Sequence, residues 1–171
     1  QNLAITSGAP IQTASYVPST SQTSLPYSGD LDGRQTGTDV YLPGGVGAPI
    51  RLAVPARIGT PEDGYPTAHT EPDTGGKSFG NTVSVIVPLE NGNEVDFMAG
   101  HLQGTSPLAN LAPGTVIPAG TIIGYQGGSG SVSGTDAIVT SHADGRNGYT
   151  ATPEDLMWIV NGMYDASGGN N

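Results

Sequence analysis

The segment LAPGTVIPAGTIIGYQGGSG, from Leu111 to Gly130, is the most informative stretch of this 171-residue chain for predicting its fold. Glycines recur throughout it, and between them lie the β-branched residues Val116, Ile117, Ile122 and Ile123. Short β-branched runs separated by glycine predict strands joined by tight turns, because glycine adopts a positive φ without steric cost. The segment therefore predicts a β protein rich in turns.

The same pattern continues on both sides of this segment. Strands are predicted, in chain order, at 37–42, 49–58, 81–88, 93–102, 115–124 and 135–142. Asn91-Gly92 predicts a hairpin, because this pair supplies the turn geometry that matches strand twist. One helix is predicted at 153–163, with Thr152 as its cap and with apolar residues at helical spacing, namely Leu156, Ile159, Val160 and Met163.

Five pieces of the chain, taken in order, resemble the lysostaphin-type (LytM-like) zinc metallopeptidases. They are GAPIRLAVPARI (47–58), GNTVSVIV (80–87), AGHL (99–102), the 111–130 segment and TPEDLM (152–157). The resemblance covers residues 28–160. It implies an all-β fold: a small β-sandwich or barrel-like domain of the lysostaphin-type peptidase fold, a duplicated hybrid motif with one short C-terminal helix.

The N-terminal segment differs in composition from the rest of the chain. Residues 1–28 are rich in Ser, Thr, Pro and Gln, which predicts an extended arm rather than a core. We expect this arm, a domain at 29–164 and a flexible tail at 165–171. The arm either lies over its own domain or pairs with the strand edge of a neighbouring subunit. Gln1 in place of Met indicates either an exported, processed chain or a trimmed one.

Composition argues against several function classes. Five Lys and Arg face 15 Asp and Glu, and the formal charge of −10 would repel nucleic acid and anionic membranes. No apolar run reaches the roughly 18 residues that a membrane-spanning helix needs. The chain has no cysteine, which removes disulfides and thiolate metal ligands. We expect a location outside the cell or on a cell or virion surface.

In the resembled family, zinc is bound by the His and Asp of H-x-x-x-D and by the second His of H-x-H. Such nitrogen and oxygen ligands leave one position for a water whose pKa the metal lowers. The first motif falls on QTGTD (35–39), where Asp39 is retained and Gln35 replaces the His. A neutral amide oxygen is a poor zinc ligand beside imidazole, so this motif is degenerate.

The second motif has two registers. Without a gap it falls on DAI (136–138), and Ile138 cannot bind a metal. With an insertion it falls on TSH (140–142), which retains a ligand in His142. Both registers lie on one side of a strand, about 13 Å apart. We favour the ungapped register, and so expect no metal or other cofactor; zinc belongs to the alternative register alone.

His101 matches the histidine of the family's A-H-L motif, although Gly100 is inserted before it. A functional His101 would act as a general base or an oxyanion donor. With the zinc ligands missing, we expect no catalytic residue, and we expect His101 and Asp136 to be remnants in the groove.

A second H-x-x-x-D spacing occurs in HTEPD (69–73). This segment follows the 49–58 strand rather than preceding it, and the prolines and glycines around it predict a loop without fixed geometry. We expect a solvated loop around His69. Metal or calcium binding by Glu71 and Asp73 is the other reading.

Three functions remain, in the order in which the sequence favours them. The first is a non-catalytic extracellular or virion-surface protein that assembles with copies of itself, as an oligomer or filament, or binds cell-wall glycan or peptide. The second is a groove-mediated binder or regulator of cell-wall enzymes. The third is an active zinc endopeptidase that cleaves peptidoglycan cross-bridges, which requires the gapped register and a substitute for Gln35.

Overall fold

A computed structural model describes residues 22–23, 27–28, 35–52, 54–59, 67–70, 78–130 and 137–160. These residues form two antiparallel sheets and one short helix, so the predicted all-β class with one helix is confirmed. Neither sheet closes into a barrel. Within the same residues, no helix is long and apolar enough to cross a membrane.

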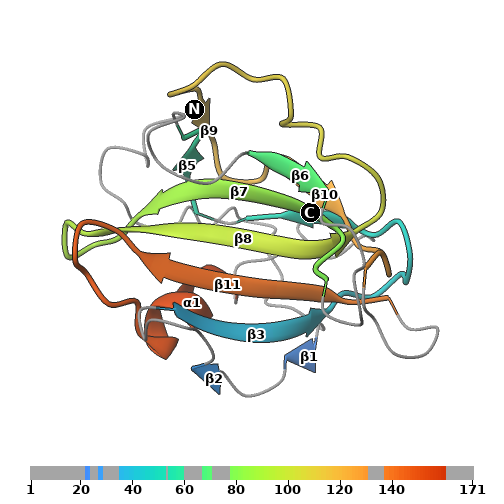
Figure 1. Ribbon diagram of the computed structural model, residues 1–171, viewed down its shortest axis with the longest axis horizontal. Helices are drawn as coiled ribbons and strands as arrows, with labels where there is room; N and C mark the ends of the chain where they lie inside the picture. The colour runs from blue at the N-terminus through green and yellow to red at the C-terminus, as the bar shows by residue number, and fades with distance from the viewer. Residues whose placement is uncertain are drawn as a thin grey trace.

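The larger sheet has nine strands, and seven of them follow one another across it (Figure 1). In spatial order these are β1 (Gln22–Thr23), β3 (Gln35–Tyr41), β11 (Val139–Gly145), β8 (Glu94–Leu102), β7 (Asn81–Pro88), β5 (Ala56–Arg57) and β9 (Val116–Ile117). The other two strands lie off this path: β2 (Tyr27–Ser28) pairs with β3, and β6 (Ala68–Thr70) pairs with β7.

The centre of the sheet joins segments that are far apart in the chain. β11 lies between β3 and β8, so that Thr140 is opposite Asp39 on one side and Gly100 on the other. Because side chains alternate between the faces of a strand, this register assigns every residue of the three strands to one face.

One face of the sheet is apolar and the other is polar. The apolar face contains fully buried residues from all four long strands, among them Val40, Val83, Phe97 and Val139. The helix α1 (Pro153–Val160) lies behind β11 and β3 and covers this face (Figure 1). The other face carries the polar residues Asp39, Ser84, Asp96, Thr140, His142 and Asp144 together with the apolar Ile86 and Met98, and we call it the polar face.

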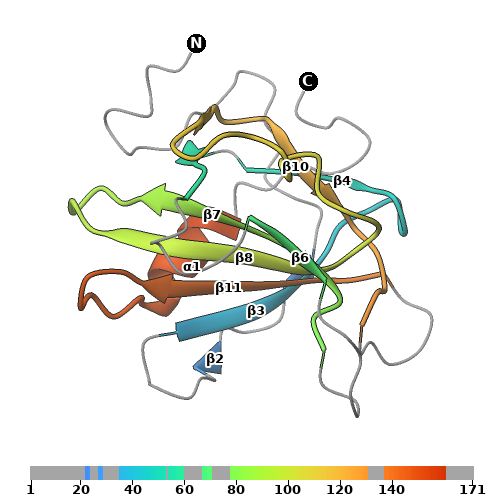
Figure 2. The ribbon, with the colours of Figure 1, turned by 45° about the horizontal axis from the view of Figure 1, so that its top comes forward.

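The smaller sheet pairs β4 (Pro49–Arg51) with β10 (Ile122–Tyr125) and lies along one side of the larger sheet (Figure 2). Ile50 and Ile123 point from it into the core. The next residue after β10, Gln126, is 1% exposed. Its side chain bonds to the backbone N–H and carbonyl of Leu42, as the backbone of a neighbouring strand would. Its side chain accepts a hydrogen bond from Leu42 N (2.8 Å) and donates to the carbonyl oxygens of Leu42 and Gly45 (both 2.9 Å).

The helix begins at a reciprocal cap. Asp155 N donates to Thr152 Oγ1 (3.1 Å), and Thr152 N donates to Asp155 Oδ2 (2.9 Å), so two backbone donors of the first turn are satisfied. Leu156, Ile159 and Val160 are buried in the core, as their spacing predicts. Residues 161–163, the end of the predicted helix, lie outside the described residues.

Three predicted strands differ from the observed ones. The 49–58 strand is divided into β4 and β5, because the chain leaves the small sheet near Pro55, which has no N–H to donate. The 115–124 strand is divided into β9 and β10 by a turn in which Thr121 N donates to Pro118 O (3.2 Å) and Gly120 has φ 87°. The last strand covers Val139–Gly145 rather than 135–142.

The described residues of the N-terminal arm lie on their own domain. Gln22 pairs with Tyr41, and Tyr27 pairs with Gly37, so β1 and β2 both add to the outer edge of β3. Residues 1–21 of the arm and the 165–171 tail are outside the described part of the chain.

Candidate functional site

The polar face of the sheet carries two of the residues that the sequence singles out, Asp39 and His142. Thr140, His142 and Asp144 are each at most 9% exposed, which is high burial for polar side chains. Three cross-strand rows run from β3 across β11 to β8: Asp39–Thr140–Gly100, Gly37–His142–Met98 and Gln35–Asp144–Asp96.

Asp39, the retained position of the first motif, is held by the strand opposite it. The hydroxyl of Thr140 donates to Asp39 Oδ1 over 2.9 Å. This hydrogen bond fixes the orientation of the carboxylate against the sheet. No local pattern pairs these two residues, because 101 positions separate them.

His142, the ligand retained in the gapped register, lies in the second row opposite Gly37. It therefore shares a face with Asp39, one row along the sheet. Its imidazole contacts the ring of Phe79 edge-on, with the ring centroids 5.0 Å apart and the planes at 75°. This edge-to-face arrangement is the preferred geometry for aromatic rings.

His101 lies at the end of β8 in a left-handed backbone conformation, with φ 62°. This conformation is uncommon for a residue with a Cβ. Its Nδ1 is 2.7 Å from the carbonyl oxygen of Ser129. Because a carbonyl oxygen only accepts, Nδ1 carries the proton, and in the neutral ring Nε2 is the acceptor. His101 is 6% exposed, so it is a buried, oriented side chain.

Close backbone contacts hold His101 in this position. A Cβ on Gly130 would lie 2.4 Å from Gly80 N, and a Cβ on Gly80 would lie 2.4 Å from Ser129 Oγ. The Ser129 hydroxyl in turn donates to Leu102 O (2.6 Å) and accepts from Asn81 N (3.0 Å). These glycines therefore permit a close approach of two loops beside the histidine.

Phe79 is the residue of this site that the sequence reasoning missed. Its ring contacts both His142 and His101, the latter at 6.0 Å between centroids, and its carbonyl accepts from His101 N (2.6 Å). A Cβ on Gly100 would lie 3.1 Å from Phe79 Cβ. The glycine that is inserted before His101 thus makes room for the Phe79 side chain. The signal in the sequence is an aromatic residue directly before Gly80, which precedes the first residue of β7.

The other end of the polar face is an ion-pair network. Arg146 Nη1 donates to both oxygens of Asp96 (2.9 and 3.2 Å), and Arg57 Nη2 donates to both oxygens of Glu94 (2.9 and 3.1 Å). In each pair one guanidinium nitrogen contacts both carboxylate oxygens, and these charge-assisted hydrogen bonds hold the side chains in place. We assign this end of the face a structural role.

The remaining candidates are dispersed. Ile138 forms an isolated bridge with Gly127 just before β11 begins, and it offers no ligand atom. His69 lies in β6, opposite Thr82 of β7, so the prediction of a loop at this residue is wrong: pairing with the edge of β7 overrides the local breakers. Glu71, Asp73, Asp136 and the side chain of Gln35 lie outside the described residues.

Of the positions that match the family's zinc ligands, Asp39 and His142 share one face in neighbouring rows, whereas Ile138 lies before β11 and has no ligand atom. Asp39 is bonded to Thr140, His142 packs on Phe79, and Ile138 is apolar. No three His, Asp or Glu side chains in the described ranges are grouped closely enough to hold a metal ion. The expected absence of a metal stays a prediction, which elemental analysis tests. The chain matches no protein-family model and no curated protein.

Proposed function

We propose that this chain is a non-catalytic structural or binding protein, built on a degenerate lysostaphin-type scaffold, which assembles with copies of itself outside the cell or on a virion surface. The observation that carries the proposal is the pairing of arm residues with a sheet edge. Gln22–Thr23 and Tyr27–Ser28 both add antiparallel to the outer edge of β3.

An arm that pairs with a strand edge can pair with the edge of its own domain or with the same edge of a neighbouring copy. The hydrogen bonds are made by the backbone, so the arm of a neighbouring copy would satisfy the same edge with the same partners. Exchange of an identical element between copies is a low-cost route to oligomers. If each arm reaches the next copy rather than returning, the contact is head-to-tail and propagates into a filament.

The non-catalytic part of the proposal is supported by how the polar face is packed. Phe79 contacts both His101 and His142, so an apolar ring lies against the two imidazoles that peptidase chemistry would use. The Asp39 carboxylate is bonded within the sheet to Thr140. These contacts support a structural use of side chains that the resembled family uses for catalysis.

Two single-cysteine variants test the arm exchange directly, since the natural chain has no cysteine. Gln22 and Tyr41 are cross-strand partners. Opposite residues of an antiparallel pair lie about 4.5–5.5 Å apart, within reach of a disulfide. Full-length Gln22→Cys, carrying a mass tag, is mixed with untagged Tyr41→Cys, dissociated, allowed to reassociate and oxidised.

We expect a disulfide-linked heterodimer between the two variants, because only an arm on a neighbouring copy brings these cysteines together. The double variant Gln22→Cys/Tyr41→Cys is the control that reports cross-linking within one chain. An internally linked monomer from the double variant, with no heterodimer from the mixture, would show that the arm stays on its own domain. Light scattering of the natural protein and of a chain lacking residues 1–28 gives the assembly size independently.

One observation favours a second candidate, the zinc endopeptidase. His142 lies on the same face as Asp39 and opposite Gly37, between the rows of the two positions of the first motif. Stoichiometric zinc in protein purified without chelator, together with clearing of a peptidoglycan suspension that His142→Ala abolishes, would establish this activity. We expect neither zinc nor clearing.

A further inference from the structure

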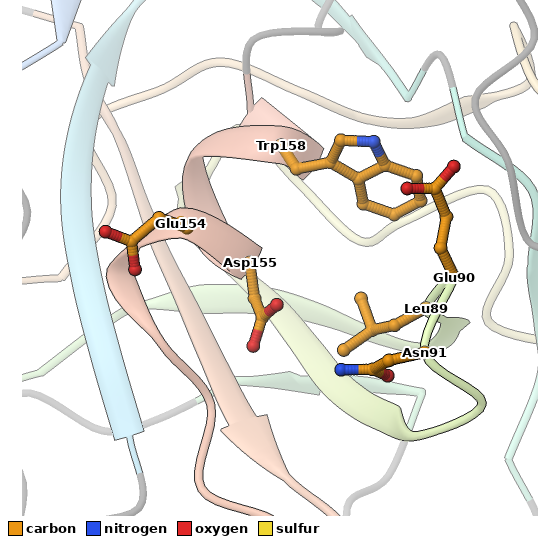
Figure 3. Close-up of a pocket in the computed structure, with 6 residues that line it drawn as sticks. All are labelled: Leu89, Glu90, Asn91, Glu154, Asp155 and Trp158. Carbon is orange, nitrogen blue, oxygen red and sulfur yellow. The ribbon is translucent and has the colours of Figure 1, made fainter.

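A separate hollow lies on the helix side of the sheet, away from the polar face (Figure 3). Its volume is about 260 Å³, and it is lined by residues from the turn after β7 and from α1: Leu89, Glu90, Asn91, Glu154, Asp155 and Trp158. Because α1 covers the face that carries Val40, this hollow and Asp39 are on opposite sides of the sheet.

One wall of the hollow is aromatic. Trp158 packs against the core with one side and is partly exposed on the other. Figure 3 shows its indole at the top of the hollow, with the Glu90 carboxylate beside it and Leu89 below. The indole and the buried Leu89 form an apolar surface that fits methylene groups, while the ring face attracts positive charge.

The rim of the hollow is negative without a cation to balance it. Glu90, Glu154 and Asp155 line it, and no described Lys or Arg does. The Asp155 carboxylate is used by the helix cap and by the Tyr149 hydroxyl, which donates to Asp155 Oδ2 over 2.5 Å. Glu154 is in the first turn of α1, where a negative charge complements the helix dipole. Glu90 is in the turn after β7, where neither a helix cap nor a helix dipole accounts for its negative charge.

We infer that this hollow binds an organic cation: an alkylammonium or guanidinium group on a short methylene chain. The methylenes would contact Leu89 and the indole, and the charged group would lie against the Trp158 ring beside Glu90. A neutral saccharide could also stack on an indole, but it would not compensate the negative charge of the carboxylates. The negative charge of the rim therefore favours a cation over a saccharide. This inference does not depend on the assembly proposal.

The same chemistry has two sources, a basic side chain of a partner protein or a soluble polyamine. Trp158 is the chain's one tryptophan, so its fluorescence reports on this hollow alone. Full-length protein is titrated with n-butylammonium, putrescine and a lysine-containing peptide at constant ionic strength. The neutral probes n-butanol and glucose are the controls.

We expect a saturable fluorescence change with the ammonium probes and at least tenfold weaker binding of n-butanol. Glu90→Gln keeps the reporter and should weaken ammonium binding about threefold, as loss of one partly exposed ion pair does. Trp158→Leu, followed by calorimetry, should weaken it about fivefold. Gln103→Lys makes the same change in net charge at an exposed residue outside the lining of the hollow and should leave the affinity unchanged.

Tighter binding of the peptide than of putrescine assigns the site to a partner protein, and the reverse assigns it to a polyamine. The inference is overturned by equal affinity for n-butylammonium and n-butanol, by tighter binding of glucose, or by an unchanged affinity in Glu90→Gln. Absence of any saturable response also overturns it.

Discussion

Replacing Gln126 by Glu should destabilise the protein by an amount that grows with pH. The Gln126 side chain is 1% exposed and makes three hydrogen bonds to the backbone of Leu42 and Gly45. Glutamate has the same shape as glutamine, so the change leaves apolar packing intact and alters only hydrogen bonding and charge.

The magnitude follows from the partners. An ionised carboxylate would face the carbonyl oxygens of Leu42 and Gly45, so the new side chain would take up a proton instead. Holding a proton at pH 7 on a group with an ordinary pKa of about 4.3 costs about 3.7 kcal/mol, at about 1.36 kcal/mol per pH unit. The acid donates one hydrogen bond where the amide donates two, which removes about 1 kcal/mol more. The free energy of unfolding should therefore fall by about 4–5 kcal/mol at pH 7 and by about 1 kcal/mol at pH 4.

Urea unfolding of the natural protein and of Gln126→Glu at pH 4, 5.5 and 7 measures this difference. The m-value should be the same in both, so the midpoint reports stability. Gln103 is exposed, and Gln103→Glu is the matched control, with an expected change under about 0.5 kcal/mol at each pH. A deficit for Gln126→Glu that is equal at pH 4 and pH 7 would contradict this prediction, because it would mean that the carboxylate reaches water.

Three further predictions use other contacts. Gly100→Ala places a Cβ 3.1 Å from Phe79 Cβ and should cost about 1 kcal/mol or more in urea unfolding; no loss would mean that Phe79 does not cover this glycine. Burial, and then the hydrogen bond to Asp155, raise the pKa of Tyr149. The contribution of the Tyr149 hydroxyl to the free energy of unfolding is therefore complete below about pH 10 and is lost as pH rises through the raised pKa. Tyr149→Phe should therefore be about 1.5 kcal/mol less stable at pH 7, with a difference that shrinks in alkali, and a constant difference contradicts this cause. The buried Ser141 Oγ has no hydrogen-bond partner within the described structure, so Ser141→Ala should raise the thermal midpoint or leave it unchanged, and a fall of several degrees argues against this.

Local patterns predicted the strands that obey them. Val83, Val85 and Val87 alternate on β7, and the Asn91-Gly92 turn leads into β8, so this hairpin could be read from neighbouring residues. The prolines at 55 and 118 also indicate the two places where predicted strands are interrupted. The apolar residues continue across both places, and this pattern favoured one longer strand at each.

The candidate site could not be predicted in the same way. The bond between Thr140 and Asp39 depends on the register of two strands that are distant in the chain, and no local rule sets that register. The position of Phe79 depends on the missing side chain of Gly100, a property visible only when the two segments meet. The hollow beside Trp158 likewise requires the helix to pack next to the turn after β7.

The order of strands in the larger sheet also determines which strand pairs can form first while the chain is being synthesised. β1 and β2 lie a few residues before β3, so their pairing is local and can form as soon as residue 41 has emerged. The inner edge of β3 must wait for β11, because Asp39 and Thr140 are 101 positions apart. Closing such a distant pair makes folding slow and leaves the inner edge of β3 open in the nascent chain. The early pairing of β1 and β2 with β3 therefore covers the outer edge of β3 during translation. A chain without residues 1–28 should aggregate more during refolding, even if its final stability is the same.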